Sequence, residues 1–108
     1  MIEVVRYQNE QGFQPFTQWL DQLKNKQAKA QIIKRLAYME LGNFGDSSSV
    51  MEGVSELRVH VGAGYRVYYA RHGQVVVVLL CGGDKSSQAR DIQLARQYWA
   101  KWKKGQKS

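Results

Sequence analysis

The sequence predicts a small α+β protein: a four-stranded, twisted and mostly antiparallel sheet with an N-terminal helical hairpin and a C-terminal helix. Residues 56–85 contain three strand-like runs separated by glycine turns, of which two alternate and the third is continuously apolar. Residues 15–41 and 92–102 carry apolar side chains at helical spacing instead. The expected element order is therefore β-α-α-β-β-β-α. A length of 108 residues suits one domain spanning residues 1–108.

The first half of the chain predicts one strand and two helices. Residues 2–7 alternate weakly and predict the opening strand. Pro15 suits the first position of a helix, because its missing N–H would have no intrahelical acceptor there. The apolar stripe of this helix consists of Phe16, Trp19, Leu20 and Leu23. A second helix is expected from about Ala28 to Leu41, where Gly42 ends it, so the two form a hairpin.

The segment after the hairpin predicts a loop and then three strands. Residues 42–53 are rich in glycine and serine, which is typical of a mobile loop. The turns between the strands are expected at Gly62-Ala63-Gly64 and at His72-Gly73. The continuously apolar run Val75–Leu80 predicts a strand that is buried on both faces and lies centrally.

A glycine pair separates the last strand from the last helix. We expect Gly82 and Gly83 to form a loop, after which Ser86 or Ser87 caps the helix. The apolar stripe of that helix contains Ile92, Ala95, Trp99 and Trp102.

The charge of the chain is positive and uneven. The formal net charge is +7, and residues 51–108 hold ten Lys and Arg against four Asp and Glu, whereas residues 1–50 hold six against five. The basic half is also the half with the predicted strands. A polyanion such as RNA is the first candidate partner, and a solvated basic surface that aids solubility is the alternative.

Several classes of protein are disfavoured by composition. Cys81 is the only cysteine, so an intramolecular disulfide is impossible and a reducing, cytoplasmic location is expected. Cys81 ends an apolar run, which favours an inert buried thiol. The sequence has no Cys/His cluster with metal-ligand spacing, no signal-peptide pattern, and no apolar run of membrane-spanning length. We therefore expect no cofactor and no metal.

The candidate site lies on the predicted strands. Alternation places Arg58 and His60 on one face of the first strand, and Arg66 and Tyr68 on one face of the second. Metal-free RNA cleavage needs a base for the 2′-OH, a stabiliser for the phosphorane and an acid for the leaving 5′-oxygen. Arg66 suits the phosphorane, with help from Arg58; His60 is the natural base, and Lys85 could hold the phosphate or act as acid.

Each of these residues also has a purely structural interpretation. Arg58 could pair with Glu56 or Glu52 on the surface, and His60 could be an ordinary strand residue. Lys85 could be a solvated loop lysine. Tyr68 could stack on a base or simply pack in the sheet. The glycine pair alone is a weak signal for a phosphate-binding loop.

Three strings carry a family resemblance: GVSELRV at 53–59, GYRVYY at 64–69 and LLCGGDKSSQARDIQLA at 79–95. The chain resembles the RelE/ParE superfamily of toxins, and within it the addiction-module killer proteins of the phage Gp49-like and HigB type. The resemblance covers almost the whole chain and implies the RelE-like fold. It also implies a type II toxin that is neutralised by an antitoxin, which is commonly a helix-turn-helix protein encoded by an adjacent gene.

The resemblance implies two alternative activities. RelE-like members cleave mRNA in the ribosomal A site, whereas ParE-like members inhibit DNA gyrase without chemistry of their own. Operator DNA would be bound only through the antitoxin. The sequence favours a ribosome-dependent mRNA endoribonuclease, because its cationic side chains can converge on one face.

The family's functional residues map onto this chain unevenly. Arg66 matches the phosphate-stabilising arginine, while Arg58, His60 and Lys85 fall near basic positions of the ribonuclease members. Further RNA contacts are expected from Tyr68, Arg71, Lys101 and Lys103. Several ribonuclease members have a tyrosine or histidine near the C-terminus, where this chain has Asp91 and Ile92, and Tyr98 lies further along the helix. Either the chemistry rests on Lys85 and the arginines, or the site is not a typical RelE site.

An apolar antitoxin groove is expected beside Trp99 and Trp102.

Overall fold

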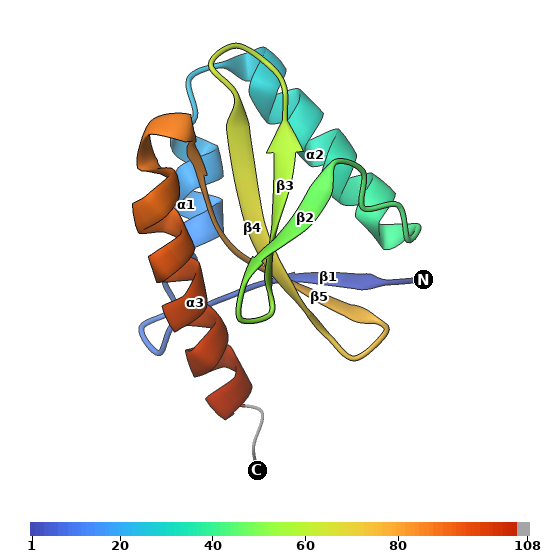
Figure 1. Cartoon of the computed structure of the whole chain (residues 1–108), viewed down its shortest axis with the longest axis vertical. Coiled ribbons are helices and arrows are strands. Elements are labelled where there is room, and N and C mark those ends of the chain that lie inside the picture. The colour runs from blue at the N-terminus through green and yellow to red at the C-terminus, as the bar shows by residue number, and fades with distance from the viewer. Residues whose placement is uncertain (106–108) are drawn as a thin grey trace.

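The computed structural model describes residues 1–105 and shows an α+β fold in which three helices surround one sheet (Figure 1). The strands are β1 (Glu3–Arg6), β2 (Ser47–Met51), β3 (Val54–Val59), β4 (Tyr65–His72) and β5 (Val76–Asp84). The helices are α1 (Pro15–Gln22), α2 (Lys26–Glu40) and α3 (Gln88–Gly105), and the short 3₁₀ helix η1 (Lys85–Ser87) precedes α3. The predicted α+β class and the predicted helices are confirmed.

The sheet has five strands in the order β1-β5-β4-β3-β2, so the prediction of four strands is wrong. The fifth strand is β2, which lies within the segment expected to be a loop. Its serines have low strand propensity, but they pair antiparallel with β3 from Ser47 opposite Leu57 to Met51 opposite Val54. A tight turn at Glu52 and Gly53, both with positive φ, closes this hairpin. Pairing across the hairpin therefore overrides the local sequence signal.

The sheet is mixed because its first strand runs parallel to β5. Glu3 pairs with Val76 and Arg6 with Leu79, whereas the other three strand pairs are antiparallel. The sheet thus joins the N-terminus to a strand more than 70 positions later in the chain.

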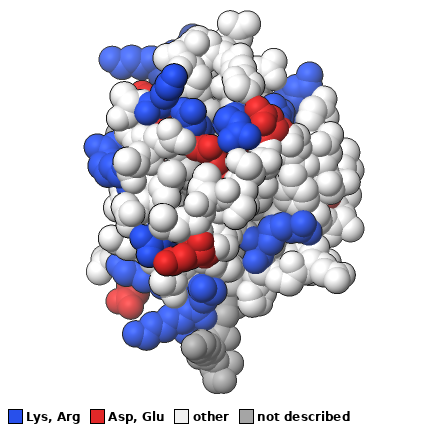
Figure 2. Space-filling view, in the orientation of Figure 1, with Lys and Arg blue, Asp and Glu red and all other residues white. Residues whose placement is uncertain are grey.

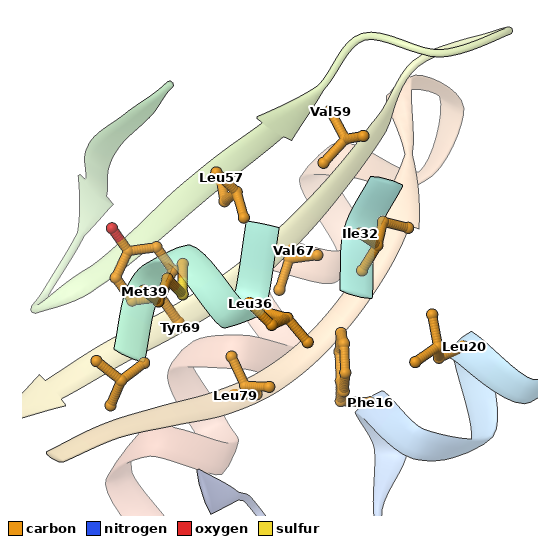
Figure 3. Packing of buried hydrophobic residues seen from close by; sticks show 11 residues of the cluster. Phe16, Leu20, Ile32, Leu36, Met39, Leu57, Val59, Val67, Tyr69 and Leu79 are labelled. Carbon is orange, nitrogen blue, oxygen red and sulfur yellow. The ribbon is translucent and has the colours of Figure 1, made fainter. Parts of the chain in front are cut away.

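The two faces of the sheet carry separate hydrophobic cores. The helical hairpin packs on one face, where Phe16, Ile32 and Met39 meet sheet residues such as Leu57 and Leu79 (Figure 3). Helix α3 packs on the other face, where the buried residues include Val54, Tyr68, Val78, Leu80, Ala95 and Trp99. Strand β5 contributes to both cores, as expected for its continuously apolar sequence.

The glycine pair lies inside β5 rather than in a loop, which corrects the prediction. A Cβ at Gly82 would overlap the Trp19 ring of α1, and a Cβ at Gly83 would overlap the Asp91 carboxylate of α3. Successive strand residues point to opposite faces, so each glycine lets one helix approach the sheet closely. The pair therefore has a packing role.

At the start of α3, the hydrogen-bond acceptors are the carboxylates of Asp84 and Asp91, and the serines that were expected to cap the helix act as donors. Asp84 accepts hydrogen bonds from the backbone N–H and hydroxyl of Ser86, at 2.9 and 2.6 Å. The Ser87 hydroxyl donates to the buried carboxylate of Asp91 at 2.5 Å. These contacts fix the direction in which α3 leaves the sheet.

We predict that Gly83→Ala destabilises the protein by about 1–3 kcal/mol, because α3 must shift to accommodate the methyl group. Thermal unfolding monitored by circular dichroism measures this change. Gly105→Ala is the matched control, since a Cβ there meets no atom within 4 Å. Equal unfolding temperatures for Gly83→Ala and the wild type would contradict this account of the glycine pair.

Candidate functional site

An open cleft of about 380 Å³ lies where β3 ends and β4 begins. Its lining includes Arg58, His60, Arg66 and Lys85, together with residues 62–65 of the connecting turn. The structure thus brings together all four side chains that the sequence singled out for chemistry. In Figure 2, basic and acidic surfaces lie side by side in the upper half of this face, near the β3–β4 turn. The cleft is therefore cationic but not free of acidic neighbours.

Strand register explains why the two arginines meet. Arg58 of β3 pairs directly with Arg66 of β4, and Gly83 of β5 pairs with Arg66 on its other side. Like charges directly opposite each other in a sheet destabilise it. Glu56, two positions before Arg58 on the same face, offsets this repulsion by contacting both guanidinium groups.

Arg66 keeps its terminal nitrogens available. Its Nε lies 3.0 Å from Oε1 of Glu56, although the N–H is not aligned for a hydrogen bond. Its side chain is 16% exposed, and within residues 1–105 neither terminal nitrogen donates a hydrogen bond to the protein. A guanidinium held at Nε and open at its two NH₂ groups can bind phosphate through both.

Arg58, in contrast, is engaged by protein groups at every nitrogen. Its Nε and Nη2 both donate to Oδ1 of Asp46, and its Nη1 donates to Ser48 and Glu56. The Asp46 hydrogen bond raises the pKa of Arg58, so its charge is permanent. Arg58 thus supplies positive potential but has fewer free donors than Arg66.

His60 is paired with the same aspartate. Its Nε2 lies 2.7 Å from Oδ2 of Asp46, and its side chain is 73% exposed. The hydrogen bond from His60, followed by that from Arg58, lowers the pKa of Asp46 below its ordinary value. Asp46 was missed by sequence reasoning, because it lies in a glycine- and serine-rich segment without any pattern that marks it.

The second residue that sequence reasoning missed is Glu56, which appeared only as a surface partner for Arg58. In the structure its side chain is 4% exposed and lies beneath the cleft. Oε1 accepts hydrogen bonds from Gln88 at 2.9 Å and Tyr68 at 3.2 Å and lies 3.0 Å from Nε of Arg66, whereas Oε2 contacts Arg58. The available signal was an acidic residue two positions after Val54, on the same face of a predicted strand, since a buried carboxylate there needs partners.

Tyr68 does not offer a stacking surface, which corrects one predicted RNA contact. Its side chain is fully buried in the core under α3, and burial raises the pKa of its hydroxyl. No nucleobase can reach its ring in this conformation.

The other predicted RNA contacts lie outside the cleft. The Arg71 guanidinium lies 4.6 Å from the Phe44 ring centroid, and Phe44 belongs to the core under the helical hairpin. Lys103 lies 5.3 Å from the Trp99 ring near the end of α3. Lys101 is exposed on the same helix, roughly 20 Å from its first residue at 1.5 Å per residue. The structure therefore does not group these three residues with the cleft.

The C-terminal helix supplies no substitute for the missing family tyrosine. Asp91 is buried against Ser87, and the Tyr98 ring stacks on Tyr7 with 4.9 Å between centroids. Trp99 is largely buried and stacks on the more exposed Trp102. Neither Asp91 nor Tyr98 lines the cleft, so both alternatives left open by the sequence stay compatible with this placement: chemistry that rests on Lys85 and the arginines, or a site that is not a typical RelE site.

Other features of the described residues fit a site of this kind less well. A second hollow of about 440 Å³ along α1 is lined by Phe13, Asp21 and neutral polar residues, with no cation. Burial raises the pKa of the Cys81 thiol to about 12, which disfavours a nucleophilic role. Within residues 1–105, no three His, Cys, Asp or Glu side chains are arranged to hold a metal ion. None of the helices in this range combines the length and apolar character needed to cross a bilayer.

A basic α+β protein with an open cleft that is rich in cations is the class that the fold and site define. The chain belongs to the phage-derived protein Gp49-like family (DUF891), whose family model matches residues 18–100. It is also 52% identical over 81 residues to an uncharacterized protein of Haemophilus influenzae, covering 75% of this chain and 82% of that protein. The family is that of Gp49- and HigB-type toxins, which are associated with toxin–antitoxin modules.

We predict that His60→Ala raises the pKa of Asp46, because the largest cause of its depression is removed. Carbon-detected NMR titration of the side-chain carboxyl measures this value. A depressed carboxyl pKa stabilises the fold at pH values above the unfolded value of about 3.9. That contribution is lost as the pH falls through the folded value, and His60→Ala should reduce it.

His72→Ala is the control for this titration, since His72 contacts Trp102 and not Asp46. An unchanged Asp46 titration in His60→Ala would show that the two side chains do not interact in solution.

Proposed function

We propose that this protein is the toxin of a type II toxin–antitoxin module and acts as a metal-independent endoribonuclease on mRNA at the ribosome. Membership of the Gp49-like family supports the toxin class and a cognate antitoxin as partner. The observation that carries the ribonuclease proposal is the state of Arg66, which lines the cleft and whose terminal nitrogens have no protein acceptor among residues 1–105. A protein that inhibits gyrase by binding alone, and catalyses no reaction, would not need an arginine with free terminal nitrogens beside a histidine and a lysine.

The proposed reaction is an internal transesterification of the RNA backbone. The 2′-OH loses its proton and its oxygen forms a bond to the adjacent phosphorus, while the bond from phosphorus to the 5′-oxygen breaks. The leaving oxygen takes up a proton, so the products are a 2′,3′-cyclic phosphate and a 5′-hydroxyl. The pentavalent phosphorane carries more negative charge than the starting phosphodiester, and fixed cations stabilise it selectively.

The cleft residues divide these tasks. Arg66 binds two non-bridging oxygens of the phosphate through its free NH₂ groups, and Arg58 adds positive potential from the neighbouring strand. His60 is the group suited to accept the 2′-OH proton, and its contact with Asp46 through Nε2 leaves Nδ1 free for this purpose. Lys85, which lies on η1 and also lines the cleft, holds the phosphate or protonates the leaving oxygen.

The proposed partners follow from the same site. The substrate is mRNA presented by the ribosome, and the antitoxin is a helix-turn-helix protein that also carries any operator contact. Trp102, which lies on α3 beside Trp99, is a suitable anchor for that antitoxin because it is aromatic and only partly buried.

We predict that induced expression of the wild type arrests growth and produces new 5′ ends inside translated codons, whereas Arg66→Ala does neither. Loss of one phosphorane-stabilising donor should reduce cleavage by about 100-fold or more. Primer extension on an abundant mRNA measures the 5′ ends, and a growth curve measures the arrest.

Arg96→Ala is the matched control, because Arg96 is also an arginine paired with a glutamate, Glu52, at the far end of β3. It should remain toxic. Growth arrest with intact mRNA and a DNA-damage response would instead support gyrase inhibition and remove the catalytic role of the cleft.

A further inference from the structure

Glu56 is the acidic residue that contacts both arginines of the cleft. It lies on β3 and faces the α3 side of the sheet, directly opposite Tyr68 of β4. Its side chain is only 4% exposed. A carboxylate taken out of water at this depth is tolerated only when it is well paired.

The partners of Glu56 come from three different elements. Arg58 of β3 donates to Oε2 at 3.0 Å, and Arg66 of β4 places Nε 3.0 Å from Oε1. Gln88, the first residue of α3, donates to Oε1 at 2.9 Å. Glu56 therefore connects both cation-bearing strands to the start of α3.

The contact with Arg66 determines which of its nitrogens face solvent. Because Glu56 occupies the Nε side of the guanidinium, the two NH₂ groups remain on the open side. Without this contact, Arg66 would be repelled by Arg58 directly across the strand pair and would have no carboxylate beside it.

The contact with Gln88 acts on the other cation of the cleft. Gln88 follows η1, the single turn that begins with Lys85. Fixing Gln88 therefore fixes the segment that carries Lys85. One carboxylate thus constrains the position of Arg66 directly and that of Lys85 through three residues of chain.

We propose that Glu56 is the positioning residue of the cleft, which orients Arg66 and the Lys85 segment toward one phosphate without touching it. This inference rests on the proposed ribonuclease function. If Glu56 only stabilises the fold, replacing it should lower both the affinity for RNA and the cleavage rate. If Glu56 positions the cations, replacing it should lower the cleavage rate without lowering the affinity. Removing the negative charge leaves the cleft more cationic, so RNA is held at least as tightly while the reacting phosphate is misplaced.

The test compares Glu56→Gln with the wild type in two assays. Fluorescence anisotropy with a labelled single-stranded RNA gives affinity, and single-turnover cleavage of a short mRNA in a reconstituted translation system gives the rate. We expect affinity equal to or tighter than that of the wild type and a cleavage rate about 100-fold lower, the effect of a misplacement near 1 Å.

Glu52→Gln is the matched control, because it removes the same charge from a glutamate that also pairs with an arginine, but away from the cleft. Gln88→Leu is the second variant, which removes only the donor from α3 and keeps the proposal testable where Glu56→Gln does not fold. It should lower the cleavage rate about tenfold with unchanged RNA affinity. Cleavage by Glu56→Gln and Gln88→Leu at the rate of Glu52→Gln would overturn the positioning role.

A readout independent of activity separates this inference from the proposed function. The Nε of Arg66 is buried and lies 3.0 Å from the Glu56 carboxylate, whose charge holds the guanidinium in place. Its N–H should therefore exchange slowly with solvent in the wild type and faster in Glu56→Gln, as measured by ¹⁵N NMR. If the wild type cleaves no RNA, the ribonuclease proposal fails, and the exchange rates alone then decide the positioning role. Equal exchange in both proteins would overturn it.

Discussion

The close approach of two helices to opposite faces of β5 is the constraint on which the rest of the structure depends. Gly82 admits Trp19 of α1, and Gly83 admits the Asp91 carboxylate of α3. Gly83 is also the cross-strand neighbour of Arg66. Larger side chains at these two positions would push the helices outward, and α3 would carry η1 and Lys85 away from the cleft. The packing of the sheet and the geometry of the site are therefore determined by the same two residues.

The cleft is a chain of alternating charges rather than a simple cationic patch. Asp46 contacts His60 and Arg58, Arg58 contacts Glu56, and Glu56 contacts Arg66. Each internal pairing uses donors that would otherwise attract an anion. Phosphate binding therefore depends on the side chains whose hydrogen-bond donors have no protein acceptor, such as Arg66, and not on the number of positive charges in the cleft.

The sequence was sufficient to predict the helices, the strands with strong patterns and the face on which Arg58, His60 and Arg66 lie. These predictions depend on local periodicity, which a single sequence records directly. It did not predict β2, because the pairing of Ser47 with Leu57 is a tertiary interaction that opposes local propensity. It also did not predict that Tyr68 is buried, since alternation assigns a face but does not say whether a helix covers it. The roles of Asp46 and Glu56 depend on contacts between elements, so the sequence left Asp46 unmarked and offered Glu56 only as a surface partner for Arg58.

The pairing of β1 with β5 has a consequence for biosynthesis. Glu3 finds its partner only at Val76, and the cleft is complete only when Lys85 and Gln88 are in place. A chain emerging from the ribosome carries Arg58 and Arg66 well before it can close this sheet, since non-local strand pairing must await the later segment. The site therefore forms only after residue 88 has been synthesised, and every shorter nascent chain lacks it.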